Sequence, residues 1–183
     1  MSIKKTIAKY IKNKNYVKIR RGFNNENFTD ITGYILAHSD TFIVIATIDE
    51  FFFSGLNCIP VNTILEIRRN KTDKYFEMIL KNECPEILKK ITKSYNTIDI
   101  TSFKTTFKSL KKQEECVIVE CEREKHQYFS IGYIEKVSNK NATINHFNAQ
   151  GILQDPIKEK FKQITKIMYQ DNYSNTFKKY IKS

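Results

Sequence analysis

The chain has 183 residues, which suits one ordinary domain or two small ones. Apolar residues make up 40% of it and aromatic residues 13%, so the chain can bury a core, and disorder throughout is excluded. The formal net charge of +11 is concentrated in residues 1–21, 81–113 and 156–183. This basicity indicates a polyanionic partner, although the lysine- and asparagine-rich coding of an AT-rich genome would also produce it.

The apolar pattern of the first half predicts a basic helix, five strands and a further helical region. The expected helix covers residues 6–14, and the expected strands cover residues 16–21, 31–38, 42–48, 57–60 and 64–68. The pair Ser39-Asp40 predicts a tight turn that joins the second and third strands in a hairpin. A later helix is expected from about residue 74, and Pro85 interrupts or restarts it.

The second half follows the same order. Helices are expected at residues 102–112 and 175–181, and strands at 116–122, 128–136, 142–147 and 164–169. Gly33-Tyr34-Ile35 recurs as Gly132-Tyr133-Ile134, and residues 64–67 align with 164–167, so that Ile67 corresponds to Ile167. Matches in a shared order predict an internal duplication. We therefore expect two domains, residues 1–92 and 93–183.

The expected fold class is mainly β with flanking helices (α+β), built as two tandem five-stranded small barrels. The motifs behind this expectation are Gly33-Tyr34-Ile35, Ser39-Asp40, Arg68-Arg69, Gly132-Tyr133-Ile134 and His146-Phe147-Asn148. They resemble the motifs of a bacterial family of tandem small β-barrel, Sm-like proteins, and the stretches that carry them cover more than half of the chain. The resemblance implies barrels of the Sm-like or Src-homology type, and no activity is carried over with it.

Basic residues accompanied by aromatic ones are the main candidate for a binding site. Basic grooves follow phosphates while aromatic rings stack on bases, which is how small barrels hold single strands. The candidate nucleic-acid-binding residues are Lys4, Lys5, Lys9, Lys12, Lys18, Arg20, Arg21, Arg68 and Arg69. The spacing of the first four places much of their charge on one helical face. For aromatic residues such as Tyr16, Tyr34 and residues 51–53, packing in a core is the competing interpretation.

The sequence contains no convincing catalytic or metal-binding pattern. Asp49 and Glu50 are adjacent, so they face opposite sides of a strand and cannot act as an acid–base pair. The spacing of Cys116, Cys121 and His126 differs from that of common zinc sites. We therefore expect no enzyme activity, no metal, no cofactor, and free thiols at all four cysteines.

The first ten residues contain no apolar run of the secretory type. No apolar stretch approaches the length needed to span a bilayer. We therefore expect a cytoplasmic protein without membrane contact. Our main hypothesis is a non-enzymatic binding module that contacts RNA or single-stranded nucleic acid through its basic helices. The alternatives are a protein–protein interaction module, with a protein partner or a homodimer, and a defence- or immunity-associated factor with no nucleic-acid role.

Overall fold

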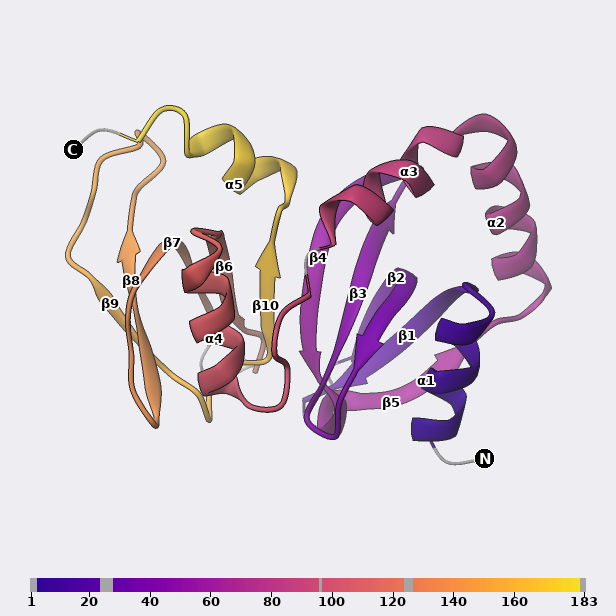
Figure 1. Ribbon diagram of the computed structural model, residues 1–183, viewed down its shortest axis with the longest axis horizontal. Helices are drawn as coiled ribbons and strands as arrows, with labels where there is room; N and C mark the ends of the chain where they lie inside the picture. Colours follow the sequence, from indigo (N-terminus) through magenta and orange to yellow (C-terminus); the bar gives the residue numbers. More distant parts are fainter. Residues whose placement is uncertain (1–2, 24–27, 96, 124–126, 182–183) are drawn as a thin grey trace. The chain divides into compact units, whose positions relative to one another are not determined.

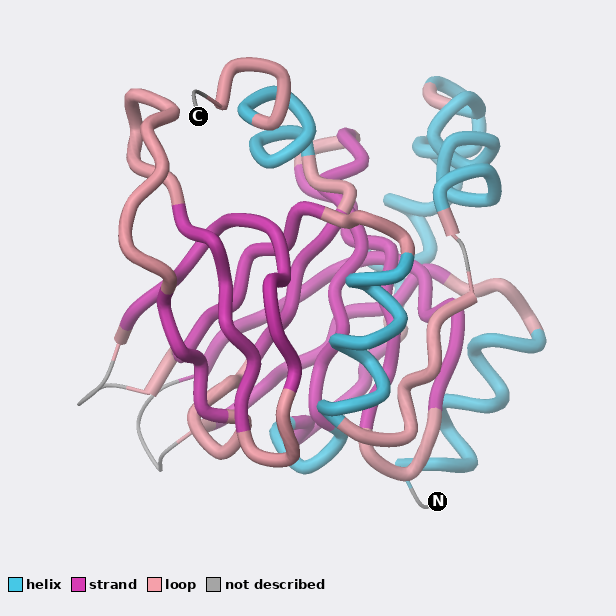
Figure 2. Tube along the Cα trace, turned by 60° about the vertical axis from the view of Figure 1, so that its left-hand side comes forward, coloured by secondary structure: helices cyan, strands magenta, loops and turns pink. Residues whose placement is uncertain are grey.

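The computed structural model describes residues 3–23, 28–95, 97–123 and 127–181. They divide into two compact units, Met1–Thr97 and Ile98–Ser183. In each unit, helices flank antiparallel strands, so the protein is mainly β (Figure 1, Figure 2). The expected boundary between residues 92 and 93 falls inside helix α3 (Pro85–Ser94).

The first unit begins with a helix, continues through five strands and ends in two helices. Its elements are α1 (Ile3–Lys12), β1 (Tyr16–Gly22), β2 (Phe28–His38), β3 (Phe42–Asp49), β4 (Phe52–Pro60), the short 3-10 helix η1 (Val61–Thr63), β5 (Ile64–Arg68), α2 (Lys71–Glu83) and α3. The strands pair in the order β5-β1-β2-β3-β4, and each neighbouring pair is antiparallel. The main difference from the sequence expectation is β4, which begins at Phe52 rather than at residue 57.

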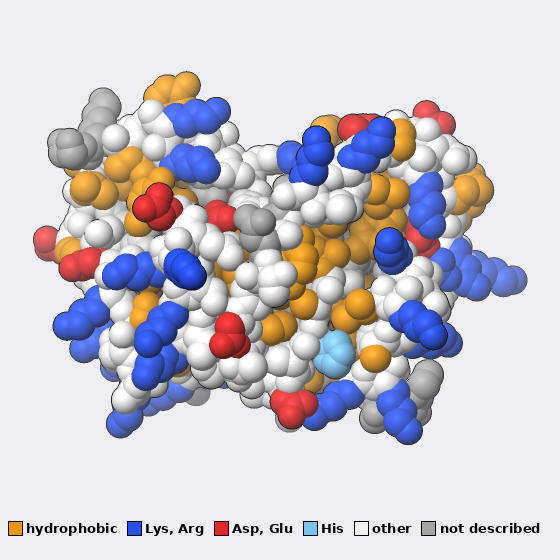
Figure 3. Space-filling model, in the orientation of Figure 1, with side chains coloured by type: hydrophobic (Ala, Val, Ile, Leu, Met, Phe, Trp, Pro, Cys, Tyr) orange, Lys and Arg blue, Asp and Glu red, His pale blue; other side chains and the backbone are white. Residues whose placement is uncertain are grey.

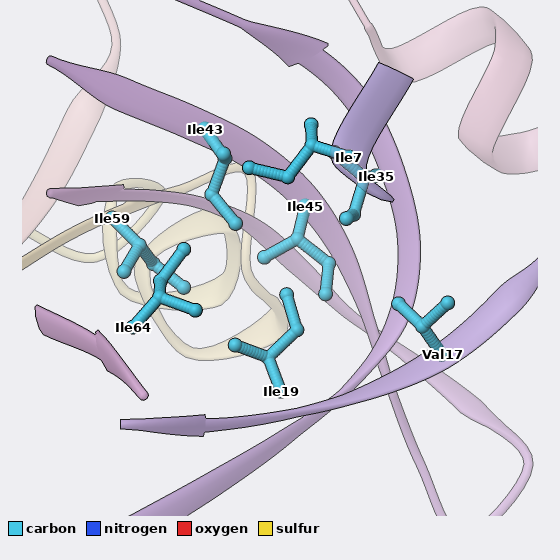
Figure 4. Close-up of a cluster of buried hydrophobic side chains, with 8 residues drawn as sticks. All are labelled: Ile7, Val17, Ile19, Ile35, Ile43, Ile45, Ile59 and Ile64. Atoms are coloured by element: carbon cyan, nitrogen blue, oxygen red, sulfur yellow. The ribbon is translucent and has the colours of Figure 1, made fainter. Parts of the chain in front are cut away.

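The core of the first unit lies between α1 and the strands. The buried side chains in Figure 4 are Ile7, Val17, Ile19, Ile35, Ile43, Ile45, Ile59 and Ile64. Those of β1 and β3 alternate along their strands, as the two-residue period of a strand requires. Ile7 is the buried residue of α1, and full burial of one such side chain stabilises the fold by roughly 1.5–3 kcal/mol.

The second unit repeats the helix and the five strands of the first, with shorter strands, and ends in one helix instead of two. Its elements are α4 (Phe103–Lys112), β6 (Cys116–Cys121), β7 (Tyr128–Val137), β8 (Asn141–His146), β9 (Ile157–Lys160), β10 (Lys166–Tyr169) and α5 (Asn172–Phe177). The strand order is β10-β6-β7-β8-β9, which is the order of the first unit with each strand replaced by its counterpart. The strand β9 was not predicted, because its segment Ile-Lys-Glu-Lys lacks an apolar alternation.

The two expected five-stranded barrels are not shown. Among the described residues, each unit has an open strand order whose last and first members are not paired with each other, namely β4 with β5 and β9 with β10. What the structure establishes is the coarser class of antiparallel strands flanked by helices. An open order arises where too few backbone groups of the two end strands approach each other to complete the hydrogen-bonded ladder.

Glycines at one shared position hold the central hairpins together. Gly33 lies opposite Val17 in β1 and Thr47 in β3, while Gly132 has the same two-sided pairing in the second unit. A Cβ added to Gly33 would lie 1.9 Å from the carbonyl oxygen of Ala46. At Gly132 the corresponding distance, to the oxygen of Asn145, is 1.8 Å. Only glycine permits this approach of neighbouring strands.

The first helix of each unit is tethered to the tip of the second hairpin. Lys4 Nζ contacts Asp40 Oδ1 at 2.7 Å, and Lys104 Nζ donates to Asn139 Oδ1 at 2.6 Å. Both tips are tight turns in which a serine hydroxyl, that of Ser39 or Ser138, accepts backbone hydrogen bonds from the following residues. The two units therefore share local geometry as well as strand order.

Candidate nucleic-acid interface

The four candidate lysines of α1 are all exposed. Lys4, Lys5, Lys9 and Lys12 flank the buried Ile7, so the helix shows its basic residues to solvent. Lys4 is engaged with Asp40, although both side chains of this pair are well exposed, at 58% and 88%. An ion pair so exposed contributes little to stability, so Lys4 remains accessible to a competing anion.

Two further candidates share one carboxylate. Lys18 Nζ lies 2.9 Å from Asp30 Oδ2, and Arg20 Nε lies 3.1 Å from Asp30 Oδ1. The hydrogen bond from Arg20, followed by that from Lys18, lowers the pKa of Asp30 to about 2. Asp30 therefore stays ionised at neutral pH and compensates much of the charge that these two residues would offer to a phosphate.

Arg21 is the least accessible of the nine candidates. Its side chain is fully buried, its Nε lies 3.4 Å from Thr63 Oγ1, and its guanidinium carbon lies 4.8 Å from the centre of the Phe23 ring. A guanidinium that packs on an aromatic ring contributes to the core of the unit. The interpretation of Arg21 as a phosphate contact is therefore not supported by its position.

Arg68 and Arg69 attach α2 to the end of β5. Arg68 donates two hydrogen bonds of 3.2 Å to Asp73, which also closes the capping box at the start of α2. Arg69 Nη2 lies 2.5 Å from Glu77 Oε2, and Lys81 Nζ lies 2.8 Å from the other oxygen of Glu77. With both carboxylates buried, these arginines have a structural role.

The aromatic residues near the first basic segment are mostly packed. Tyr16 and Tyr34 are buried and meet edge to face, with ring centres 5.7 Å apart. Phe51 stacks on Phe76 at 4.3 Å. Phe52, which is 69% exposed, is the exception in the stretch 51–53. Core packing accounts for most of these rings, so they do not form a stacking platform for bases.

A different basic cluster, which sequence analysis did not single out, lies in the second unit. It surrounds a hollow of about 620 Å³ that we call the lysine hollow. Its lining residues are Asn139, Lys140, Asn141, Lys158, Lys160, Phe161 and Lys162. They come from the β7–β8 turn, the start of β8, β9 and the segment that follows β9. Pairing of Asn141 with Lys160 brings these parts of the chain together.

The four lysines of the hollow are exposed. No acidic residue lines the hollow, and within the described part of the chain none of the four takes part in an ion pair. Lys158 and Lys160 alternate with Glu159, which is 2% exposed and hydrogen-bonds Tyr128. Burial, together with this hydrogen bond, raises the pKa of Tyr128. The acid therefore lies in the interior, while the lysines face solvent.

One lining residue of the lysine hollow packs against α4. The ring of Phe161 is buried and stacks on Phe103 and Phe107, with ring centres 5.4 Å and 5.6 Å away. Lys160 and Lys162 adjoin this packed residue in the chain. Their flexible side chains carry compact ammonium charges, which can reach anions of variable geometry.

The first unit has no basic counterpart of the lysine hollow. In the second unit, Thr143 and Asn141 of β8 pair with Lys158 and Lys160. Their equivalents in β3, Val44 and Phe42, pair with Cys58 and Pro60. Lys158 therefore corresponds to Cys58, and Lys160 to Pro60. Cys58 and Pro60 are both buried. The lysines thus replace buried, uncharged residues of the other unit.

The described residues give no support for a metal site. No group of three or more His, Cys, Asp or Glu side chains among them could hold a metal ion. All four cysteines are free, and burial raises the pKa of Cys116 to about 12. His126, the third member of the candidate zinc set, lies outside the described residues. Within the same residues, no helix is long and apolar enough to cross a membrane.

Comparison with protein-family models, with curated proteins and with solved structures finds no match to this chain.

Proposed function

We propose that the chain is a non-enzymatic binding module for RNA or single-stranded nucleic acid, and that the lysine hollow of the second unit is its principal contact. The observation that carries the proposal is the set of four exposed lysines around a hollow with no acidic lining residue. None of these lysines takes part in an ion pair with another described residue. Lysines in such a setting neutralise phosphates and release the counterions that surround a nucleic acid. The exposed lysines of α1 add long-range attraction.

Binding at this site reads the backbone and not the bases. Phe161 is buried, so no ring of the hollow is free for stacking, while Asn139 and Asn141 offer only short amide groups. Phosphate contacts position a nucleic acid without specifying its sequence. The proposal is therefore for sequence-independent binding with a strong dependence on salt.

We also propose that the two units are tandem copies of one Sm-like unit. The shared strand order, the paired glycines and the helix tethers support it. In this view the second copy acquired the binding site when its equivalents of Cys58 and Pro60 became Lys158 and Lys160. The first copy kept an uncharged wall at these positions.

The test is a matched pair of charge variants of the full chain. One replaces Lys140, Lys158, Lys160 and Lys162 by Gln, and the control replaces Lys4, Lys5, Lys9 and Lys12 by Gln. Both remove four positive charges from exposed positions, so net charge is equal between them. Fluorescence anisotropy with a labelled single-stranded RNA of about 20 nucleotides measures affinity between about 50 mM and about 200 mM salt.

The hollow variant is expected to bind more weakly than the α1 variant at every salt concentration. Its salt slope should flatten by about 0.7 for each phosphate contact that is lost. Equal weakening by the two variants would assign the binding to net charge alone and refute the site. Failure of the wild-type chain to bind at the lowest salt would remove the nucleic-acid function, leaving the protein-interaction alternative.

A further inference from the structure

An open apolar groove lies in the first unit, whereas the lysine hollow lies in the second. The groove has a volume of about 580 Å³ and lies between the end of α1, the strand β2 and the helix α3. Its apolar lining includes Ile11, Tyr34, Ile35, Leu36, Leu88 and Ile91. Figure 3 shows apolar side chains gathered in this region with basic side chains around them.

A β-bulge creates the floor of the groove. Neighbouring residues of a regular strand point to opposite faces, yet Ile35 and Leu36 both line the groove. The register between β2 and β3 shifts at this point, because Ile35 pairs with Ile45 and Ala37 with Val44. Leu36 is the extra residue of the bulge, and bulges redirect side chains in this way.

The bulge is present in both units, but its side chain is apolar only in the first. In the second unit the register shifts between Ile134 and Lys136, and the extra residue is the exposed Glu135. The carbonyl oxygen of Glu135 accepts a hydrogen bond from Lys111. A half-buried leucine in one copy and a solvated glutamate in the other indicate that the apolar groove is particular to the first unit.

The groove is bordered by positive charge. Lys14 and Lys81 belong to its lining, and no acidic residue does. Lys81 is ion-paired with Glu77, whereas Lys14 is exposed and takes part in no ion pair among the described residues. An occupant that places apolar groups on the floor therefore meets the ammonium group of Lys14 and no acidic lining residue, which favours acidic groups beside its apolar ones.

We propose that this groove binds a helical segment of a partner protein that carries apolar residues on one face and acidic residues beside them. Leu88 and Ile91 of α3, together with its C-cap residue Tyr95, follow the spacing of one helix face, and all three line the groove. This face is the kind of surface on which an amphipathic helix lies with anchors at its first, fourth or fifth, and eighth positions. The proposal rests on different residues from the lysine hollow and does not depend on it.

The experiment selects ligands without assuming their identity. A displayed library of random peptides of about 15 residues, long enough to form a helix, is selected on the full wild-type chain. Selected peptides are then synthesised, and their affinity is measured by fluorescence anisotropy for the wild type, Leu88→Glu, Thr92→Glu and a control, Leu65→Glu. Leu65 is an apolar residue that is 52% exposed and lies in β5, outside the groove.

The selected peptides are expected to share apolar residues at helical spacing with Asp or Glu nearby. Leu88→Glu and Thr92→Glu should weaken them by about tenfold or more, equal to about 1.4 kcal/mol, while Leu65→Glu should not. Thr92 is exposed, so this variant remains informative if Leu88→Glu loses its cooperative thermal transition. Basic peptides, or peptides that bind all four chains equally, would overturn the proposal. So would a concentration-dependent dimer of the wild type that Thr92→Glu dissociates, because a second copy would then be the occupant.

Discussion

Replacing Gly132 by alanine tests the most demanding contact of the second unit. The new Cβ would lie 1.8 Å from the carbonyl oxygen of Asn145 and 2.7 Å from its carbon, whereas ordinary contact begins at 3.4 Å. The obstacle is backbone of the neighbouring strand β8, which cannot rotate away as a side chain can. The strands must separate locally for the methyl group to fit.

The magnitude follows from the hydrogen bonds that this separation weakens. Two interstrand bonds near Gly132 would lose about 1 kcal/mol each, and their buried groups would lack partners at a similar further cost. The expected loss is therefore about 3 kcal/mol or more in the free energy of unfolding. For a unit of this size, that loss lowers the midpoint of its thermal transition by more than about 12 °C.

The matched control is Gly22→Ala. There the added Cβ meets Leu65 Cδ1 at 2.6 Å, which is the far end of a half-exposed, flexible side chain. Leu65 can change rotamer, so this substitution should alter stability by no more than about 0.5 kcal/mol. Urea unfolding and calorimetry of the full chain measure both variants. A Gly132→Ala chain as stable as the control would refute the register of β7 and β8 on which the position of β9 and its lysines depends.

Three further predictions concern charges and thiols. The pKa of Asp30 is lowered to about 2 from an unfolded value of about 3.9, so its contribution to stability of about 1 kcal/mol is present above pH 4 and is lost as the pH falls towards 2. Asp30→Asn should remove this part of the acid-induced loss of stability. An unchanged acid profile of unfolding would contradict the shared ion pair. Glu77→Ala should lower the free energy of unfolding in a urea titration by about 2 kcal/mol, since it leaves Arg69 without its carboxylate. The control Glu66→Ala, at an exposed position, should lower it by less than about 0.5 kcal/mol. Cys116 should react slowly with a thiol reagent at about pH 8 and rapidly after denaturation, because burial raises its pKa to about 12. Rapid labelling of Cys116 in the folded chain, located by mass spectrometry, would contradict this prediction, because the thiol would then be accessible.

Strand alternation and turn residues were sufficient to predict most of the elements. The hairpin at Ser39 and Asp40 is confirmed, because the turn joins β2 to β3 where the sequence indicated it. Pro85 begins α3 as its first residue, which confirms that it restarts the helix. The strand β9 was missed because an exposed strand with alternating lysines has no apolar period to recognise.

The candidate site was harder to predict for a different reason. A sequence shows where lysines and arginines are, but their availability depends on partners brought near by folding. Arg69 and Glu77 are eight residues apart, and Arg21 meets Thr63 from a distant part of the chain. The sequence held one signal for the lysine hollow, namely lysines at positions 158, 160 and 162. In an extended segment, residues at this spacing would share one face.

The position of these lysines bears on whether the basicity is functional or compositional. A coding bias adds lysine wherever substitution is tolerated, and exposed edge strands tolerate it well, since charged residues there prevent unwanted strand pairing. Coding bias therefore accounts for Lys158 and Lys160 on β9 but not for the rest of the hollow. Lys140 lies in a turn and Lys162 follows the strand, and both face the same space, which holds no acid. Some basic residues elsewhere, such as Lys18 and Arg69, lie against carboxylates, whereas others, such as Lys89 and Lys93, are exposed without an ion pair among the described residues. The proposal of an anionic ligand therefore rests on the convergence of four lysines on one space, and not on their lack of partners alone.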